Sequence, residues 1–195
     1  CAIDNNIWRL DLRAANAPHR AASRLLASRF NDVNPRYAPD GKRIAFASAR
    51  SGNHEIWVCG SEGEPCVQLT FFRGPHAGSP RWSPDGRWIV FDCRSEGNAD
   101  LFVISAEGGN PRRLTTEPGE EMLPSWSRDG KWIYFTSNRS GALQIWKLPA
   151  PGSAVSGSEA VQVTRQGGYK GSESVDGQWL YYTKERDLTE IWRIP

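Results

Sequence analysis

The sequence predicts an all-β fold, a β-propeller built from four-stranded antiparallel blades. The first observation is an Asp-Gly pair that recurs along the chain, each time before a strand-like run that ends in an aromatic residue. The four copies are Asp40 and Gly41, Asp85 and Gly86, Asp129 and Gly130, and Asp176 and Gly177. Their aspartates are separated by 45, 44 and 47 residues. The second observation is that strand-like segments fill the intervals, and this combination is typical of a propeller.

Tight hairpin turns explain the residues of the repeated motif. In the copy Ser83-Pro84-Asp85-Gly86, the proline presets φ for the second position of a turn, and the aspartate can accept a backbone N–H. The glycine supplies the left-handed residue of a three-residue hairpin loop. We therefore interpret these aspartates and glycines as structural turn residues, not as metal ligands or catalytic acids.

Each repeat contains four short strand signals with period-two patterning, as in Arg87–Phe91. Grouping the signals gives seventeen strands and a single propeller segment that covers about four blades. The expected units are a partial blade at 5–27, full blades at 34–70, 79–115 and 123–164, and a partial blade at 172–195. We expect the chain to be an excerpt from a larger ring. In the alternative, a strand near Leu25 completes the last unit and closes four blades.

Composition limits the classes of partner. The chain has 195 residues, with 24 Lys and Arg against 22 Asp and Glu, and a net charge of +2. This charge is too small and too scattered to predict nucleic-acid binding. No apolar run approaches the length of a membrane-spanning helix. The chain begins at Cys1, which favours a fragment over a lipid-modified amino terminus, and the compartment, periplasmic or cytoplasmic, stays open.

The cysteines and tryptophans have structural explanations. Cys59 and Cys66 end and begin neighbouring strands, so they could form a disulfide in an oxidising compartment, but we expect two free thiols. No CxxC pair is present, so we expect no zinc site and no other cofactor. All nine tryptophans fall on repeat positions, which indicates packing between sheets more than a ligand surface.

No catalytic constellation is evident. The three histidines lie in separate loops, and the G-x-S-x-G motif of a hydrolase is missing. Glu120 and Glu121 could form an acid/base pair, but we expect two solvated surface acids. Arg50, Arg94 and Arg139 recur after each second strand, so we expect each to brace its hairpin.

The loops that join a fourth strand to the next first strand are the best binding candidates because they differ between units. In a propeller they would lie on one face near the channel mouth, where repeat folds place recognition. Packing beneath the loop is the alternative for the two phenylalanines. The candidate binding residues are Phe71, Phe72, Arg73, His76, Glu120, Glu121, Tyr169 and Lys170.

The repeat Pro-x-Trp-Ser-Pro-Asp-Gly, followed by Arg-Ser-Gly, Ile-Trp and Leu-Thr, resembles the WD40-like propeller repeat called PD40. Such repeats occur in TolB and in tricorn protease-like proteins. The sequences of the repeats are most similar to those of the C-terminal propellers of bacterial CadC-like winged-helix transcriptional regulators. The last unit departs from the pattern, with Val175 in place of the proline.

The resemblance implies a non-catalytic propeller segment that mediates protein–protein interaction or senses a ligand, as the sensory part of a bacterial transcriptional regulator would. The alternatives are an accessory propeller that gates a tricorn-like or prolyl-oligopeptidase-like peptidase, and a periplasmic TolB-like scaffold. The expected partner is a protein or a peptide. Flanking coding sequence, with a winged helix, a hydrolase domain or a TolB-type domain, would discriminate between these possibilities.

Overall fold

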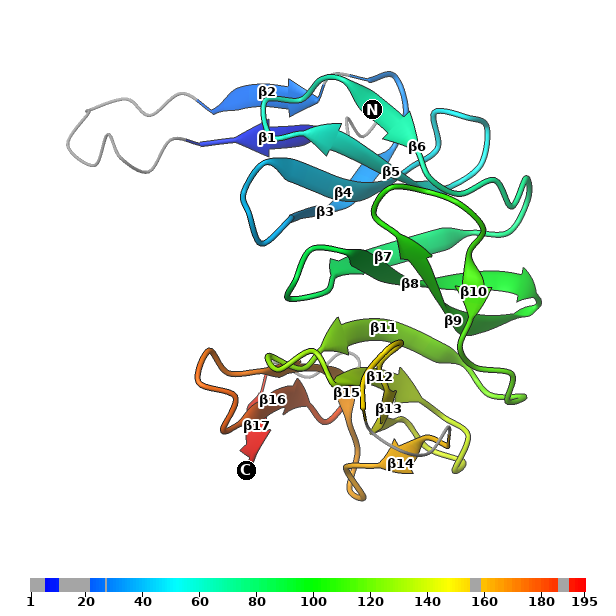
Figure 1. Ribbon diagram of the computed structural model, residues 1–195. Helices are drawn as coiled ribbons and strands as arrows, with labels where there is room; N and C mark the ends of the chain where they lie inside the picture. Colours follow the sequence, from blue (N-terminus) through cyan, green and yellow to red (C-terminus); the bar gives the residue numbers. More distant parts are fainter. Residues whose placement is uncertain (1–5, 11–21, 27, 155–158, 186–189) are drawn as a thin grey trace.

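A computed structural model describes residues 6–10, 22–26, 28–154, 159–185 and 190–195 (Figure 1). Seventeen strands and no helix occur in these ranges. The first two sheets contain β1 (Ile7–Arg9) and β2 (Ser23–Leu26), then β3 (Asp32–Tyr37), β4 (Arg43–Ser48), β5 (Glu55–Gly60) and β6 (Cys66–Gln68). The third contains β7 (Ala77–Trp82), β8 (Trp88–Glu96), β9 (Asn98–Ser105) and β10 (Arg112–Arg113). The last two contain β11 (Glu121–Trp126), β12 (Trp132–Ser137), β13 (Gln144–Pro149) and β14 (Val161–Gln162), then β15 (Tyr169–Glu173), β16 (Leu180–Thr183) and β17 (Ile191–Ile194).

Every sheet is antiparallel and follows chain order, so the sheets are meanders of two, four, four, four and three strands. The first strands β3, β7, β11 and β15 contact one another in succession, and the fourth strands lie at the outer edges. This is the blade arrangement of the predicted all-β propeller. None of the described segments forms a helix that could cross a membrane.

The Asp-Gly pairs form the turns between first and second strands. Gly41, Gly86, Gly130 and Gly177 have φ of 69°, 70°, 70° and 70°. The aspartate of each pair accepts the backbone N–H two residues later, at 2.9–3.1 Å. In three of the turns a serine hydroxyl donates to the same carboxylate. The turns thus have the left-handed glycine and the aspartate acceptor that the interpretation requires.

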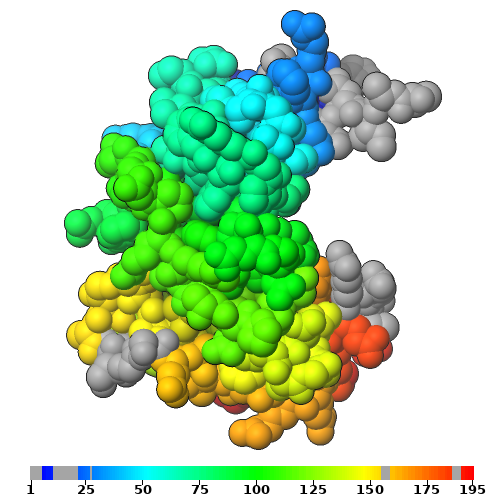
Figure 2. Space-filling view, turned by 90° about the vertical axis from the view of Figure 1, so that its right-hand side faces the viewer, coloured from blue at the N-terminus to red at the C-terminus, as the bar shows by residue number. Residues whose placement is uncertain are grey.

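The five sheets form an open arc (Figure 1). Figure 2, seen from the end where the β6–β7 and β10–β11 loops lie, shows the arc hollowed on one side. β2 pairs with β1, and the β15–β17 sheet has three strands, so the closed four-blade alternative is not observed. The Asp-Gly turns lie on the opposite face of the molecule, because each first strand begins near these loops and leads to its Asp-Gly turn.

The core lies between neighbouring sheets and is built from the second strands. Phe46, Phe91 and Phe135 occupy the same register on β4, β8 and β12 and are at most 1% exposed. The tryptophans of first strands join the sheets. Trp82 Nε1 donates to the Arg36 carbonyl at 2.9 Å, and Trp126 Nε1 donates to the Arg81 carbonyl at 3.1 Å. An indole therefore links each of these first strands to the preceding one.

The expectation of two free thiols at Cys59 and Cys66 is wrong, because the structure joins them in a disulfide. They are directly opposite residues of β5 and β6, with Cα atoms 4.0 Å apart. The spacing of the two cysteines alone was compatible with a disulfide and with two free thiols, since the register of the two strands decides which side chains face each other. Cys93 is the free cysteine of the described residues, and it is buried.

Candidate functional site

A buried ionic cluster recurs at the loop end of two sheets. In the β3–β6 sheet, the buried Asp32 accepts the Ser48 hydroxyl and pairs with Arg50 at 2.9 Å. In the β11–β14 sheet, Glu121 accepts the Ser137 hydroxyl at 2.9 Å, and an Arg139 nitrogen lies 3.0 Å away. Because each arginine also lies over a buried phenylalanine and a partly buried tryptophan, each cluster braces its own sheet.

This arrangement corrects the expectation for the acidic pair. Glu121 is fully buried, and burial raises the pKa of its carboxyl against the opposing effects of Ser137 and Arg139. Glu120 instead pairs with Arg94 at 2.7 Å near the surface. The two neighbouring acids therefore have different structural partners.

The middle sheet lacks the cluster. Ala77 and Cys93 are paired at the register where the other sheets pair Asp32 with Ser48 and Glu121 with Ser137. Arg94 follows Cys93 directly, whereas Arg50 and Arg139 lie two residues after their serines, so Arg94 is not their equivalent. Burial raises the pKa of the Cys93 thiol to about 12, which makes it an inert core residue.

The candidate loop before β7 is partly a packing element. Phe72 contacts Phe91 and Phe102 edge-on, whereas Phe71 is 62% exposed. The Arg73 backbone N–H donates to the buried Glu55 carboxylate at 2.9 Å. Phe71 is thus exposed to solvent, whereas Phe72 is partly buried against the core.

His76 and His54 lie ring to ring, with centroids 4.3 Å apart. Burial, together with the charges of His54 and Arg94, lowers the pKa of His76. The structure therefore brings together two histidines that the sequence treated as separate. No group of three metal-ligating side chains occurs among the residues described.

Of the expected residues, Lys170 alone lines the hollow side of the arc. Tyr169 opens β15, and its carbonyl accepts the Thr183 hydroxyl at 3.2 Å. Lys170 has φ of 56°, and its backbone N–H donates to Thr136 at 2.9 Å. Its exposed side chain borders a pocket on the inner face of the first strands.

Two adjoining pockets of about 570 and 600 Å³ follow the inner face of the arc. We call this surface the inner wall. Five residues line both pockets: Arg36, Arg81, Ser125, Arg128 and Ser172. Four of them, on β3, β7, β11 and β15, share one register, opposite Ala45, Val90, Tyr134 and Tyr181. The repeat thus places equivalent positions of successive sheets on one surface.

The inner wall has an excess of cations. The one carboxylate that lines it in the described part of the chain, Glu173, accepts the Arg128 backbone N–H at 2.7 Å and the Tyr134 hydroxyl at 2.8 Å. Arg36, Arg128 and Lys170 form no ion pair among the described residues, and none of the three is buried.

Burial and the neighbouring charge of Arg36 lower the pKa of Arg81 to about 10, so it stays charged at neutral pH. Burial raises the pKa of Asp92, close to Arg81, to about 6. The wall can therefore receive carboxylates or other anions.

Sequence reasoning missed the arginines of this wall. The predicted binding residues came from the loops between sheets, whereas Arg36 and Arg81 lie on first strands, directly before Tyr37 and Trp82. A signal was present, because the residue before the aromatic position points away from the sheet interface in each repeat. Comparing that position across the units would have collected both arginines.

Together, the meander sheets, their radial succession and the repeated turns define a β-propeller repeat protein. The family model of the PD40 TolB beta propeller domain matches residues 68–193, and the chain belongs to this family. This agrees with the resemblance drawn from the Trp-Ser-Pro-Asp-Gly repeat.

Solved structures show the same fold. A putative TolB from Agrobacterium tumefaciens superposes with a TM-score of 0.79 at 23% identity, over 96% of this chain and 66% of that one. TolB from Acinetobacter baumannii gives 0.72 at 24%, over 89% and 42%. A puromycin hydrolase mutant complexed with PGG gives 0.70 at 14%, over 92% and 32%. The chain therefore spans less than two thirds of the length of these proteins.

Proposed function

We propose that this chain is a non-catalytic propeller segment that binds a protein or peptide partner, and that its inner wall receives an acidic stretch of that partner. The observation that carries the proposal is the group of cations on the wall that form no ion pair with any described residue, namely Arg36, Arg128 and Lys170. Of these, Arg128 donates through Nε to the Ser174 carbonyl. Guanidinium groups bind carboxylates in a bidentate way, which suits glutamate and aspartate side chains.

The distribution of charge favours a peptide over nucleic acid as the partner. Net charge is only +2, so the chain lacks the broad basic field that a phosphate backbone requires. The cations converge on a hollow that continues over two pockets, the shape that an extended chain can follow. Neutralising a few carboxylates there needs no high overall charge.

Fluorescence anisotropy with a labelled glutamate-rich peptide tests the proposal. We expect binding in about 50 mM salt that weakens as salt screens the charges. The triple variant Arg36→Gln/Arg128→Gln/Lys170→Gln should weaken binding at least about tenfold, since hydrogen bonds to charged groups contribute about 1.5–3 kcal/mol each.

A charge-matched control separates the wall from net charge. Arg29→Gln/Lys42→Gln/Arg165→Gln removes three charges as well, from exposed positions outside the wall and outside the other pockets described below. It should retain the affinity of the unmodified chain within about threefold. Equal losses in both triple variants would show that the peptide responds only to net charge, and the inner wall would be rejected.

The accessory propeller of a peptidase is the second candidate function, and the superposition on a puromycin hydrolase favours it at the level of fold. A sensory propeller of a transcriptional regulator and a TolB-like scaffold remain compatible with the same wall. Sequencing the flanking gene tests these assignments. A hydrolase domain, a winged helix or a TolB-type domain would select one and exclude the other two.

A further inference from the structure

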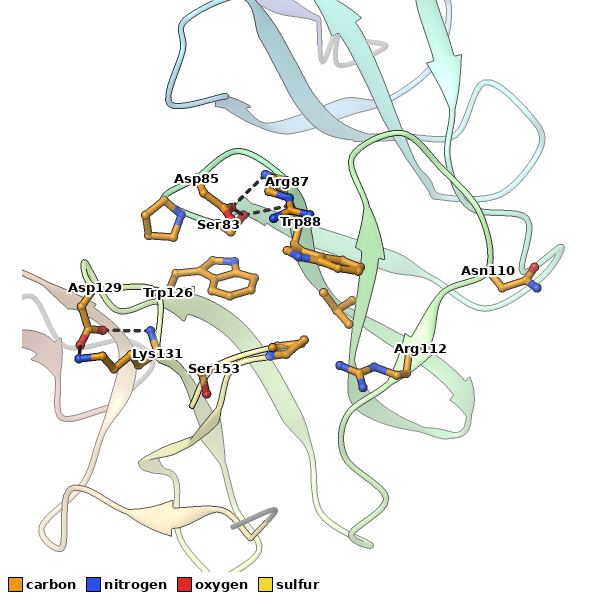
Figure 3. Close-up of a pocket in the computed structure, with 15 residues that line it drawn as sticks. Ser83, Asp85, Arg87, Trp88, Asn110, Arg112, Trp126, Asp129, Lys131 and Ser153 are labelled. Atoms are coloured by element: carbon orange, nitrogen blue, oxygen red, sulfur yellow. Dashed lines mark hydrogen bonds and ion pairs between the residues drawn. The ribbon is translucent and has the colours of Figure 1, made fainter. Parts of the chain in front are cut away.

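A third pocket lies between the β7–β10 and β11–β14 sheets, on the face of the molecule that carries the Asp-Gly turns. It has a volume of about 770 Å³ and is bordered by the turns at Asp85 and Asp129 and by Pro151 from the β13–β14 connection. Figure 3 shows Trp88 and Trp126 on one side and Arg112 reaching toward the space from the other. We call it the intersheet pocket. Its volume is within the range of small-molecule sites.

The preceding intersheet groove is narrower, with a pocket of about 320 Å³ beside Arg43 and Glu107. There, the Arg43 guanidinium lies 5.0 Å from the ring centroid of Trp82 and pairs with Glu107 at 2.8 Å. Trp126 is the repeat equivalent of Trp82, but Trp88 stands where the earlier repeat has Arg43, two residues after the turn glycine. The larger volume of the intersheet pocket agrees with the absence, in its repeat, of the arginine that covers Trp82.

Trp88 also lacks the cation that covers its own equivalents. Lys147 lies 4.4 Å from the centroid of Trp132, and Arg193 lies 4.1 Å from that of Trp179. At the corresponding register, opposite Val90, β9 has Val103, which lines the pocket. Within the described ranges, neither indole of this pocket has a cation stacked on it.

The carboxylates around the pocket bond to residues other than Arg112. The Asp129 carboxylate accepts the Lys131 backbone N–H and pairs with its ammonium group at 3.1 Å. Asp85 accepts the Ser83 hydroxyl within its turn. Arg112 is exposed and forms no ion pair with any residue in the described part of the chain. A free guanidinium therefore faces two uncovered indoles.

We propose that the intersheet pocket binds a small aromatic carboxylate. The ring of the ligand stacks on Trp88 and Trp126, and its carboxylate pairs with Arg112. A cationic ligand would also suit indole faces, but the charges of Arg112 and Arg87 at the same pocket disfavour it. The intersheet pocket shares Pro84 and Trp126 with the inner wall, but the two surfaces share no cation, so Arg112 distinguishes this site.

Isothermal titration with 2-naphthoate, followed in parallel by tryptophan fluorescence, tests the site. We expect saturable binding to the unmodified chain and a loss of about tenfold or more in affinity for Arg112→Gln. The neutral 2-naphthamide should bind about tenfold more weakly than 2-naphthoate, and glucuronate, an acid without an aromatic ring, should bind more weakly still. Equal binding of the amide or of glucuronate would refute recognition of an aromatic carboxylate.

Two further variants fix the location. Trp88→Arg reproduces the narrower groove, with an arginine over Trp126 as Arg43 lies over Trp82, and should abolish binding while the chain stays folded. Arg165→Gln, at an exposed arginine that borders neither the intersheet pocket nor the inner wall, should leave binding of 2-naphthoate unchanged. Full affinity in Trp88→Arg or in Arg112→Gln, or no binding by the unmodified chain, would overturn the proposal. None of these results depends on whether the wall binds acidic peptides.

Discussion

At the scale of single residues, the turn glycines make the sharpest stability test. Gly86 has φ of 70°, and a Cβ built there would meet only Pro39 Cδ, at 3.6 Å. The cost of Gly86→Ala is therefore conformational and not a clash. We expect a loss of about 1 kcal/mol in the free energy of unfolding, seen as a melting temperature lowered by about 2–4 °C.

Gly74→Ala is the matched control. Gly74 lies in a loop, has no positive φ recorded, and offers open space around the added Cβ. We expect its melting temperature to change by less than half as much as that of Gly86→Ala. If both substitutions had the same effect, the left-handed conformation would not be the cause of the loss.

The raised pKa of Asp92 predicts that the stability of the folded chain depends on pH. Burial raises the pKa of its carboxyl from 3.8 to about 6, so the folded chain holds a proton that the unfolded chain has released between these values. The contribution of Asp92 to stability therefore falls as pH rises from about 4 to 6. Asp92→Asn keeps the oxygen that accepts the Leu123 N–H and cannot ionise.

Thermal unfolding between pH 4 and pH 7 measures this contribution. The melting temperature of Asp92→Asn minus that of the unmodified chain should increase with pH and level off above pH 6. Glu117→Gln, at an exposed carboxyl, should show no such trend. A difference for Asp92→Asn that stays flat with pH would contradict the raised pKa.

Residue conformations that depend on the local chain were predictable, and environments that depend on distant residues were not. The Asp-Gly turn specifies the positive φ of Gly86 from four neighbouring residues. The environment of Glu121 depends instead on Ser137 and Arg139, at and just after the end of the paired strand β12. Adjacent acids look solvated in a sequence because the sequence does not show which of them lies on the inner side of a sheet.

At the scale of the structural element, the buried ion pair braces the β11–β12 hairpin. Arg139→Gln removes the partner of a fully buried carboxylate and should destabilise the chain by about 3 kcal/mol in urea unfolding. The control is Arg94→Gln, which removes the surface pair with Glu120 and should cost less than about 1 kcal/mol. Similar losses for both arginines would mean that the repeated cluster is not a structural brace.

Strands and their order were predictable because each carries its own period-two pattern and is bounded by turn residues. The pairing of Cys59 with Cys66 was not, although both strands were recognised. A disulfide requires that the two residues be directly opposite, and the register of β5 on β6 is set by the whole sheet.

At the scale of the whole molecule, the inner wall arises from repetition. Arg36 and Arg81 come from different sheets and meet only because successive first strands stack in an arc. Lys170 was found as a loop candidate, whereas the arginines needed the register of all the sheets. The PD40 pattern therefore predicted the scaffold, and the surface that we propose as its binding site became visible only in three dimensions.

Photo-crosslinking tests the central claim, that the partner binds on the inner wall, most directly. A glutamate-rich peptide with a photoreactive group at its centre is bound, irradiated and digested, and the adducts are located by mass spectrometry. We expect adducts in 36–37, 123–128 and 170–172, which line the wall, and their loss in high salt. Adducts concentrated on the outer strands β6 and β14, with none on the wall, would contradict the account.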